Sequence, residues 1–386
     1  MISKIIFWTS IFFIGYVYVG YPLLLFILSR FRTRPVRKRD FNPSVSFIIT
    51  AYNEERRIGA KIENTLQQRY LAKNLEIIIA SDCSTDRTDE IAKTFGPQGV
   101  TLVRTPERGG KENAQKCAVQ TASGEVLIFS DVATNLPPDG VSNIVKNFND
   151  RTVGCVSSID RFVDGEGRTS GEGVYVRYEM LLRSLETNVN SLVGLSGSFF
   201  AARREICSDW AVGLPSDFTT LLNSVKRGLR GVLDRDSIGY YRNVSDGKKE
   251  YDRKVRTVLR GISALMKSLF LLNPLRYGLF SWQLFSHKLC RWLVPFALGT
   301  LLISNVFLAG HAAFYLITLI VQIAFYSAAC AGAMLAPLAE TGLFRIPSFF
   351  VLVNLSILHS WYLYLRGKRL TAWEPTRRPE YPQEAR

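Results

Sequence analysis

Between about residues 43 and 254, short apolar runs typical of buried β-strands alternate with segments of helical spacing. Four such runs follow one another, with the sequences VSFIITA, LEIIIA, VTLV and EVLIFSD. Each is followed by a segment in which apolar residues recur at helical intervals, such as KENAQKCAVQTA after the third run. Strands that are apolar along their whole length and alternate with helices predict an α/β fold, with a mostly parallel sheet and helices on both faces.

An apolar segment from Ile5 to Ser29 is long enough to cross the roughly 30 Å core of a bilayer as a helix. A signal peptide is the alternative, but the run is too long for one and no small-residue cleavage site follows it. Residues 30–39, RFRTRPVRKR, contain six basic residues and no acid, which indicates a cytoplasmic flank. A nucleic-acid-binding arm would have the same charge, but the adjacent apolar span favours membrane anchoring.

Three further apolar blocks lie near the C-terminus, at 293–309, 312–337 and 346–365. The stretch before them, 262–285, is interrupted by charged residues and a proline, which favours amphipathic helices lying in the membrane interface. Four spans that start outside would leave the basic tail outside as well, against the positive-inside rule. Either one block is re-entrant, or the interfacial stretch crosses the membrane, or the tail breaks the rule.

The resulting organisation has five parts. We expect an N-terminal transmembrane helix with its basic flank, a cytoplasmic α/β domain, interfacial helices, C-terminal transmembrane helices and a basic tail, at residues 1–40, 41–260, 261–288, 289–366 and 367–386.

The formal net charge of +15 is compatible with nucleic acid, anionic lipid or acidic substrates as partners. The six cysteines have no CxxC spacing, and there are only three histidines, so the composition argues against a zinc site. We interpret the cysteines as reduced thiols.

Polar and charged residues follow each predicted strand, in the sequences AYNEE, SDCSTD, RTPERGGKEN and SDVATN. Ligands of open α/β sheets bind outside the carboxyl ends of the strands, so we expect Glu54, Asp82, Lys111 and Asp131 to contact a ligand. Such residues can also simply cap helices, as we expect for Ser84 and Asp86. The sequence has no GxGxxG after its first strand and no P-loop, which weighs against dinucleotide binding.

The motifs AYNEE, SDCSTDRT, GGKENA and SDVAT, in this order, resemble those of the family 2 glycosyltransferases, which have a GT-A fold. The resemblance covers roughly residues 44–260. It extends more loosely to membrane-bound synthases of the cellulose, hyaluronan and poly-N-acetylglucosamine type, which also carry flanking spans.

By this resemblance, the donor-binding residues come from the ends of the strands. Ala51 and Glu54 would contact the base or ribose of a nucleotide sugar, and Asp82 would face the uracil. Lys111 would lie near the diphosphate and ribose. Asp131 stands where the family has the first Asp of its DxD motif, which implies bound Mg²⁺ or Mn²⁺. The second acid is replaced by alanine in SDVA, so the metal would rest on Asp131, diphosphate oxygens and water.

The second half of the domain supplies the acceptor-side candidates. The segment GSFFAARRE resembles the family's acceptor-lining segment, which implies roles for Gly197 and Ser198, although Phe199 or Phe200 can equally belong to a core strand. Asp217 matches the family's catalytic acid, and its carboxylate could take the proton of the acceptor hydroxyl. Capping of the following helix is the alternative role, and both can hold together.

Three arginines at helical spacing, Arg253, Arg256 and Arg260, fall on one face of a helix. Such a face is often solvated or contacts lipid headgroups, but the family carries Q-x-x-R-W here. Arg256 matches the family's arginine and could stabilise the leaving diphosphate. Arg253, in place of the glutamine, is an acceptor-side candidate. Thr257 replaces the tryptophan, which removes a stacking platform for an acceptor sugar and argues against processive synthesis.

These features predict an inverting glycosyltransferase of a bacterial inner membrane, with its catalytic domain in the cytoplasm. It would move a sugar from a nucleotide-diphosphate donor, such as a UDP-sugar, to a polysaccharide or lipid-linked acceptor in exopolysaccharide or cell-surface glycan synthesis. Expected partners are the nucleotide sugar, the acceptor, the bilayer and glycan-assembly proteins, and not nucleic acid. The alternatives are a single-sugar transferase acting on polyprenyl phosphate or a glycolipid, and a non-catalytic membrane scaffold.

Overall fold

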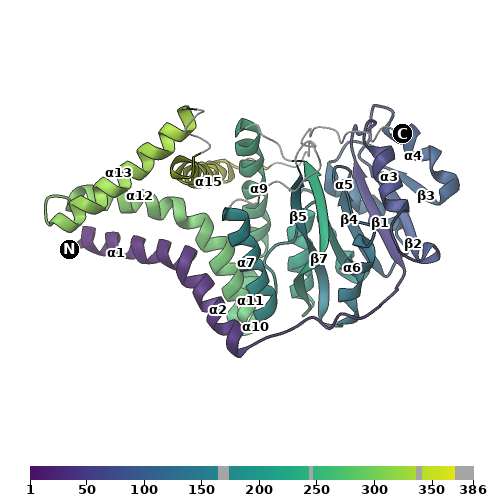
Figure 1. The fold of residues 1–386 in the computed structure, drawn as a ribbon, viewed down its shortest axis with the longest axis horizontal. Helices are drawn as coiled ribbons and strands as arrows, with labels where there is room; N and C mark the ends of the chain where they lie inside the picture. The colour runs from purple at the N-terminus through teal and green to yellow at the C-terminus, as the bar shows by residue number, and fades with distance from the viewer. Residues whose placement is uncertain (164–173, 243–246, 336–340, 370–386) are drawn as a thin grey trace. The chain divides into compact units, whose positions relative to one another are not determined.

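The computed structural model describes residues 1–163, 174–242, 247–335 and 341–369. The chain divides into two compact units (Figure 1). The sheet unit contains residues 28–245 and 263–281, and the helical unit contains residues 1–27, 246–262 and 282–369.

The sheet unit is built on a seven-stranded sheet with the order β3-β2-β1-β4-β6-β5-β7. Strands β1 to β4 pair in parallel, β6 runs antiparallel to both β4 and β5, and β7 is parallel to β5. The predicted mostly parallel sheet is therefore confirmed. The strands are β1 Val45–Ala51, β2 Leu75–Ser81, β3 Val100–Arg104, β4 Val126–Asp131, β5 Val153–Val163, β6 Phe199–Arg203 and β7 Arg230–Arg242.

Helices cover both faces of the sheet. Because side chains alternate between the two faces of a strand, Phe47 and Ile49 of β1 enter one core while Ile48 between them enters the other. The first core also takes in residues of α3, α4 and α6, and the second takes in residues of α5 and α8. The helices of the sheet unit are α3 Ile58–Leu66, α4 Thr88–Thr94, α5 Lys111–Thr121, α6 Gly140–Lys146, α7 Val174–Val189, α8 Ser216–Lys226 and α10 Pro274–Tyr277.

The register of the sheet brings the predicted ligand-binding segments to one edge. Ala51 at the end of β1 pairs with Ser81 at the end of β2, and Thr50 pairs with Asp131 at the end of β4. The loops that follow these three strands therefore leave the sheet side by side.

Within the described residues, four helical segments are long and apolar enough to cross a membrane: Ile2–Phe31, Leu279–Leu308, Ala313–Met334 and Gly342–Leu365. They overlap the four apolar blocks found in the sequence. The second starts at Leu279, so it also takes in part of the stretch expected to be interfacial. These segments comprise α1 Ile2–Gly15, α2 Tyr21–Phe31, α11 Leu279–Leu284, α12 Arg291–Leu308, α13 Ala313–Met334 and α15 Gly342–Leu365, with π-helical turns at Tyr16–Gly20 and Phe285–Cys290.

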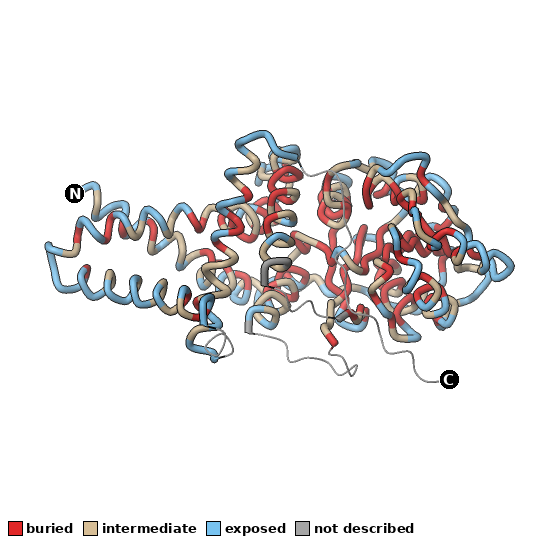
Figure 2. Tube along the Cα trace, turned by 90° about the horizontal axis from the view of Figure 1, so that it is seen from above, coloured by how far each residue is buried: buried red, intermediate tan, exposed pale blue. Residues whose placement is uncertain are grey.

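Within the helical unit, α1 packs against α12, where Phe7 is buried together with Leu308 and Tyr315. The outward faces of α1, α12 and α13 are apolar but exposed, as Phe12, Ile303 and similar residues show (Figure 2). Large exposed apolar surfaces of this kind are typical of helices that contact lipid. A polar contact occurs where the two π-helical turns meet, because Tyr16 Oη lies 2.6 Å from Ser286 Oγ.

The basic flank is not a free arm, because residues 34–38 are bound to the sheet unit. Arg34 donates to Asn190 Oδ1 at 2.9 Å, and Lys38 Nζ lies 2.5 Å from Asp234 Oδ1. The buried guanidinium of Arg230 donates to the carbonyl oxygens of Arg34 and Pro35. Part of the flank's positive charge is therefore neutralised by the sheet unit.

Candidate active site

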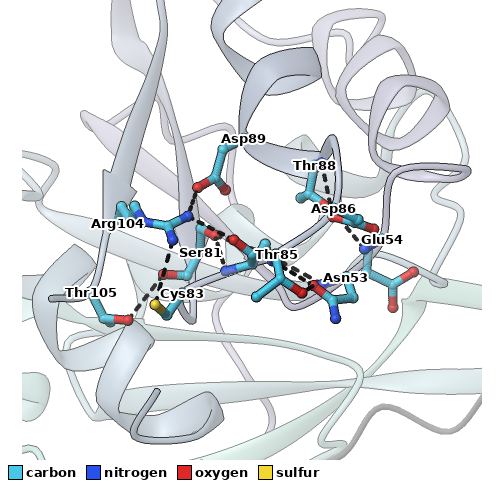
Figure 3. A network of polar contacts seen from close by, with 11 residues as sticks. Asn53, Glu54, Ser81, Cys83, Thr85, Asp86, Thr88, Asp89, Arg104 and Thr105 are labelled. Atoms are coloured by element: carbon cyan, nitrogen blue, oxygen red, sulfur yellow. Dashed lines mark hydrogen bonds and ion pairs between the residues drawn. The ribbon is translucent and has the colours of Figure 1, made fainter. Parts of the chain in front are cut away.

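The polar tip of the loop after β1 binds the loop after β2 (Figure 3). Asn53 adopts the left-handed conformation, with φ of 52°, and its Oδ1 accepts a hydrogen bond from Thr85 N at 2.8 Å. Glu55 N donates in turn to Asp86 Oδ2 at 3.1 Å. Asp86 Oδ1 also accepts from Thr88 N at the start of α4, although the N-cap residue of this helix is Arg87. The AYNEE motif is polar in part because it joins two strand-end loops.

Replacing Asn53 with Ala should lower stability by about 1–3 kcal/mol, because the acceptor for Thr85 N disappears and alanine tolerates the left-handed conformation poorly. The thermal midpoint of the full chain in detergent measures this loss. Asn53→Gly, which keeps the conformation but not the acceptor, should lose less. Equal midpoints for wild type and Asn53→Ala would contradict the role assigned to this side chain.

Glu54 is buried and lies within electrostatic range of Asp131. Its carboxylate pairs with the Arg57 guanidinium at 2.6 Å, and its backbone N donates to Thr88 Oγ1 at 2.7 Å. Burial raises the pKa of Glu54, against the opposing effect of Arg57, and the charge of Asp131 raises it further. The Ala51 side chain is buried, and its carbonyl accepts from Asp82 N at 2.9 Å.

Asp82 is fully buried and holds the glycine turn before α5. Its Oδ1 accepts from Gly109 N at 2.9 Å, and its Oδ2 accepts from Gly110 N at 2.9 Å. Gly110 has a φ of 88°, a conformation that favours glycine, and it immediately precedes Lys111. In the structure, Asp82 therefore fixes the point from which Lys111 projects.

Lys111 joins the donor-side and acceptor-side candidates. Its Nζ lies 2.5 Å from Asp131 Oδ1 and donates to the Gly197 carbonyl at 2.9 Å. The backbone N of Asp131 donates to the Ser198 carbonyl at 3.0 Å. Segments that lie far apart in the sequence thus converge at one edge of the sheet.

Asp217, the candidate base, adjoins this cluster at Gly197. A methyl group added at the exposed Gly197 would lie 3.5 Å from Asp217 Oδ2. Asp217 is half-buried in the first turn of α8, where a carboxylate interacts favourably with the helix dipole. The residue before the helix, Pro215, provides no side-chain cap. The position of Asp217 therefore suits both a carboxylate that stabilises the helix and a general base.

The segment GSFFAARRE divides into a core strand and an exposed edge. Phe199 and Phe200 are fully buried in β6, and Phe200 stacks on Phe129 with ring centroids 4.8 Å apart. The core-strand interpretation is therefore confirmed for both phenylalanines. Gly197 and Ser198 precede the strand and lie at the edge where Lys111 and Asp131 meet.

Sequence reasoning missed Asp160, a half-buried residue of β5. Its carboxylate accepts from Ser196 Oγ at 2.7 Å and from Ser198 Oγ at 2.5 Å. These bonds fix the loop that carries Gly197. Asp160 lies outside the predicted strands and motifs, so no sequence signal pointed to it.

Sequence reasoning also missed Lys61, a buried residue of α3. Its Nζ donates to the Thr134 carbonyl at 2.6 Å, in the loop after β4. Burial lowers the pKa of Lys61 from near 10.5 to about 7, against the opposing effect of Asp131. The feature of the sequence that could have indicated a buried Lys61 is its position next to the apolar Ile62 in a predicted helix.

The lowered pKa of Lys61 predicts that stability depends on pH. Between pH 7 and about 10.5 the unfolded chain binds a proton that the folded chain does not, so raising the pH favours the folded chain. Lys61→Met removes this effect. The thermal unfolding midpoint of Lys61→Met should therefore exceed that of wild type by more at pH 6.5 than at pH 9. A difference that stays constant across this range would contradict a neutral Lys61.

Arg253 and Arg256 lie on α9, Gly247–Lys267, in the part that belongs to the helical unit. Arg253 forms a bidentate ion pair with Glu250, one turn earlier in the helix, with Nε–Oε2 and Nη2–Oε1 distances of 2.8 and 2.9 Å. The other predicted site residues all belong to the sheet unit.

Within the described ranges, no three His, Cys, Asp or Glu side chains are grouped to hold a metal ion. The Asp131 side chain is 32% exposed, and one of its oxygens pairs with Lys111. Mg²⁺ binds through one or two carboxylates together with substrate phosphates and several waters. A single, partly exposed carboxylate fits a cation that arrives with a diphosphate.

Comparison with known proteins identifies the domain. Residues 46–210 match the model of glycosyl transferase family 2. These residues form a family 2 glycosyltransferase domain. A mannosyltransferase from Pyrobaculum calidifontis, solved with GDP-Man and Mn²⁺, aligns with 94% of the chain at a TM-score of 0.70 and 21% identity, over the whole of that structure. This likeness confirms the GT-A fold.

Relatives of the domain include two enzymes with lipids in their names. The UDP-Glc:alpha-D-GlcNAc-diphosphoundecaprenol beta-1,3-glucosyltransferase WfaP of Escherichia coli is 38% identical over 87 residues, which is 22% of this chain and 34% of that protein. The beta-monoglucosyldiacylglycerol synthase of a Nostoc strain is 25% identical over 213 residues, which is 53% of this chain and 46% of that protein. The chain thus spans less than half the length of these two relatives.

Proposed function

We propose that this family 2 glycosyltransferase transfers a sugar, with inversion, from a nucleotide-diphosphate donor to a lipid-linked acceptor at the membrane. The contact that supports this most is the Lys111 ammonium, which bridges Asp131 and the Gly197 carbonyl beside Asp217. A cationic group between a cation-binding carboxylate and a candidate base is the arrangement that displacement of a diphosphate needs.

On the donor side, the strand-end loops containing Ala51, Glu54 and Asp82 would enclose the nucleotide. Asp131 would hold Mg²⁺ or Mn²⁺ together with diphosphate oxygens and water. Such a cation, when bound, would neutralise charge that develops on the leaving diphosphate. Lys111 would donate to the same diphosphate from the start of α5.

On the acceptor side, Asp217 would accept the proton of the acceptor hydroxyl as its oxygen attacks the anomeric carbon. The bond from that carbon to the diphosphate oxygen breaks, and the nucleoside diphosphate leaves. Attack opposite to the leaving group inverts the configuration. Gly197 is exposed, so an acceptor can approach Asp217 closely, while Ser198 is proposed as a further acceptor contact.

The membrane helices support an acceptor that resides in the bilayer. Among the described residues, four helical segments are long and apolar enough to cross a membrane, and both relatives described above have lipids in their names. Thr257 in place of the family's tryptophan favours transfer of one sugar over processive synthesis. We place the chain in a bacterial inner membrane with the domain on the cytoplasmic side, where the basic flank would lie. There it would act in glycan assembly, alongside other assembly proteins.

The test is to incubate the full chain in detergent with UDP- and GDP-sugars, Mg²⁺ or Mn²⁺, and fluorescent polyprenyl diphosphate-sugar or diacylglycerol acceptors. We expect one donor to be consumed and one sugar to be added to a lipid acceptor. Products with many added sugars would favour a polysaccharide synthase. If no donor is consumed and calorimetry shows no binding of UDP or GDP, the chain is a scaffold and the proposal is wrong.

A further inference from the structure

One polar face of α3 and the turn after it binds the loop that follows β4. Lys61 Nζ donates to the Thr134 carbonyl at 2.6 Å. Asn64, one turn later, forms two hydrogen bonds with the backbone of Leu136, from its Nδ2 to the carbonyl at 2.9 Å and from the backbone N to its Oδ1 at 3.0 Å. These bonds satisfy loop carbonyls and N–H groups that the sheet does not pair.

Gln68 extends the same face by one more turn. Its Nε2 donates to the Pro137 carbonyl at 3.0 Å, and its Oε1 accepts from Val141 N at 3.1 Å. Lys61 and Asn64 are three residues apart and so project from one side of α3, and Gln68 lies in the turn directly after the helix. We call these three residues the α3 clamp.

The opposite side of the loop is bound by β7. Asn135 pairs with Tyr240 through two backbone hydrogen bonds of 2.8 and 2.9 Å. A methyl group added at Gly239 would lie only 2.9 Å from Thr134 Cγ2, so strand and loop are in close contact. The loop is therefore held between α3 and β7.

The clamped loop leads directly back to Asp131. Thr134 N donates to the Asp131 carbonyl at 3.2 Å and closes a turn over residues 131–134, and the Thr134 carbonyl is the acceptor for Lys61. The turn contains Ala133 where the family has its second acid. Asp131 is thus the single carboxylate of this turn, and its position depends on how the turn is held.

Lysine at position 61 is unfavourable for the stability of the folded chain, because the side chain is buried. It is only 3% exposed, and its Nζ lies 5.4 Å from the centre of the Phe47 ring. Burying an amino group, charged or neutral, costs more than burying an apolar side chain of similar length, such as methionine. A lysine here therefore indicates a role other than packing.

We infer that Lys61 is a positioning residue, which with Asn64 and Gln68 fixes the loop after β4 and thereby sets the Asp131 carboxylate for the donor and its cation. The inference rests on the proposed function for what Asp131 binds. The clamp itself rests on the hydrogen bonds alone.

The test uses Lys61→Met in the full chain in detergent. Thr65→Val is the matched control, because Thr65 is buried on the same helix and its hydroxyl donates only within α3. Hydrogen exchange should rise about tenfold at the amides of residues 132–141 in Lys61→Met, and stay at the wild-type rate in β1 and β2. The donor KM should rise about tenfold with the acceptor KM unchanged, because donor and acceptor contact different parts of the site.

Exchange at residues 132–141 that matches wild type in Lys61→Met would overturn the inference, as would the same increase in Thr65→Val. If Lys61→Met does not fold, the double variant Asn64→Ala and Gln68→Ala removes the other clamp contacts and must show the same local rise. The exchange measurement needs no turnover. A wild-type chain that consumes no donor would contradict the proposed function, whereas a donor KM unaffected by Lys61→Met in an active enzyme would contradict the positioning role alone.

Discussion

Asp217→Asn should lower kcat by about 10²- to 10⁴-fold while the nucleoside diphosphate still binds. The asparagine amide has nearly the same shape as the carboxylate but cannot accept a proton from the attacking hydroxyl. The carboxylate lies beside the exposed Gly197 and not among the buried donor loops, so donor affinity should change little. Transfer rates with a fluorescent lipid acceptor, together with calorimetry of UDP or GDP binding, separate the two effects.

Asp209→Asn is the control for Asp217→Asn. Asp209 is an acid of the same unit with a side chain that is 62% exposed, and its Oδ2 lies 3.9 Å from both Lys226 Nζ and Arg227 Nη2. It should retain wild-type transfer. Near-normal turnover in Asp217→Asn would show that another group takes the proton.

Asp131→Asn should weaken donor binding itself by about 10- to 100-fold. The substitution removes the carboxylate that pairs with Lys111 and that would hold the cation. Wild-type affinity for UDP or GDP should increase when Mg²⁺ or Mn²⁺ is added, and the variant should lose most of this increase. Calorimetric titrations with and without the cation measure both quantities.

Asp236→Asn serves as the comparison for Asp131→Asn, because Asp236 is 69% exposed and pairs with Lys38 in the basic flank. Its donor affinity should match wild type. A cation response in Asp131→Asn as large as that of wild type would mean that the metal binds through other groups.

The sequence predicted the parallel half of the sheet because each of its strands is continuously apolar and each is followed by a helix. The strand β1 was predicted with the bounds that the structure gives it, and the end of β4 at Asp131 was also correct. The antiparallel β6 between β4 and β5 could not be predicted in this way. The place of β6 in the sheet depends on pairing with β4, a segment about 70 residues earlier in the chain, and hydrophobic periodicity carries no information about such pairing.

The predicted site residues of the sheet unit lie on neighbouring loops, because strand register brings Ala51, Ser81 and Asp131 to one edge. The contacts of these residues were less predictable. Asp82 was expected to face the base, and in the structure both of its oxygens accept from a glycine turn. Such a bond to backbone leaves no residue-type signal in the sequence.

Lys61 and Asp160 were missed for a related physical reason. Each acts on a loop far away in the chain, Lys61 on Thr134 and Asp160 on Ser196 and Ser198. A charged residue in an apolar pattern marks a buried contact, but it does not say which loop is contacted.

The central claim is that a nucleoside diphosphate binds where Lys111 meets Asp131, with Asp217 on the acceptor side. A structure of the chain with UDP or GDP and Mn²⁺ tests this most directly. We predict that Lys111 Nζ contacts the diphosphate, that Asp131 binds the cation, and that Asp217 faces the position of the anomeric carbon. A nucleotide bound away from the ends of β1, β2 and β4, with the Lys111–Asp131 pair unchanged, would contradict the account.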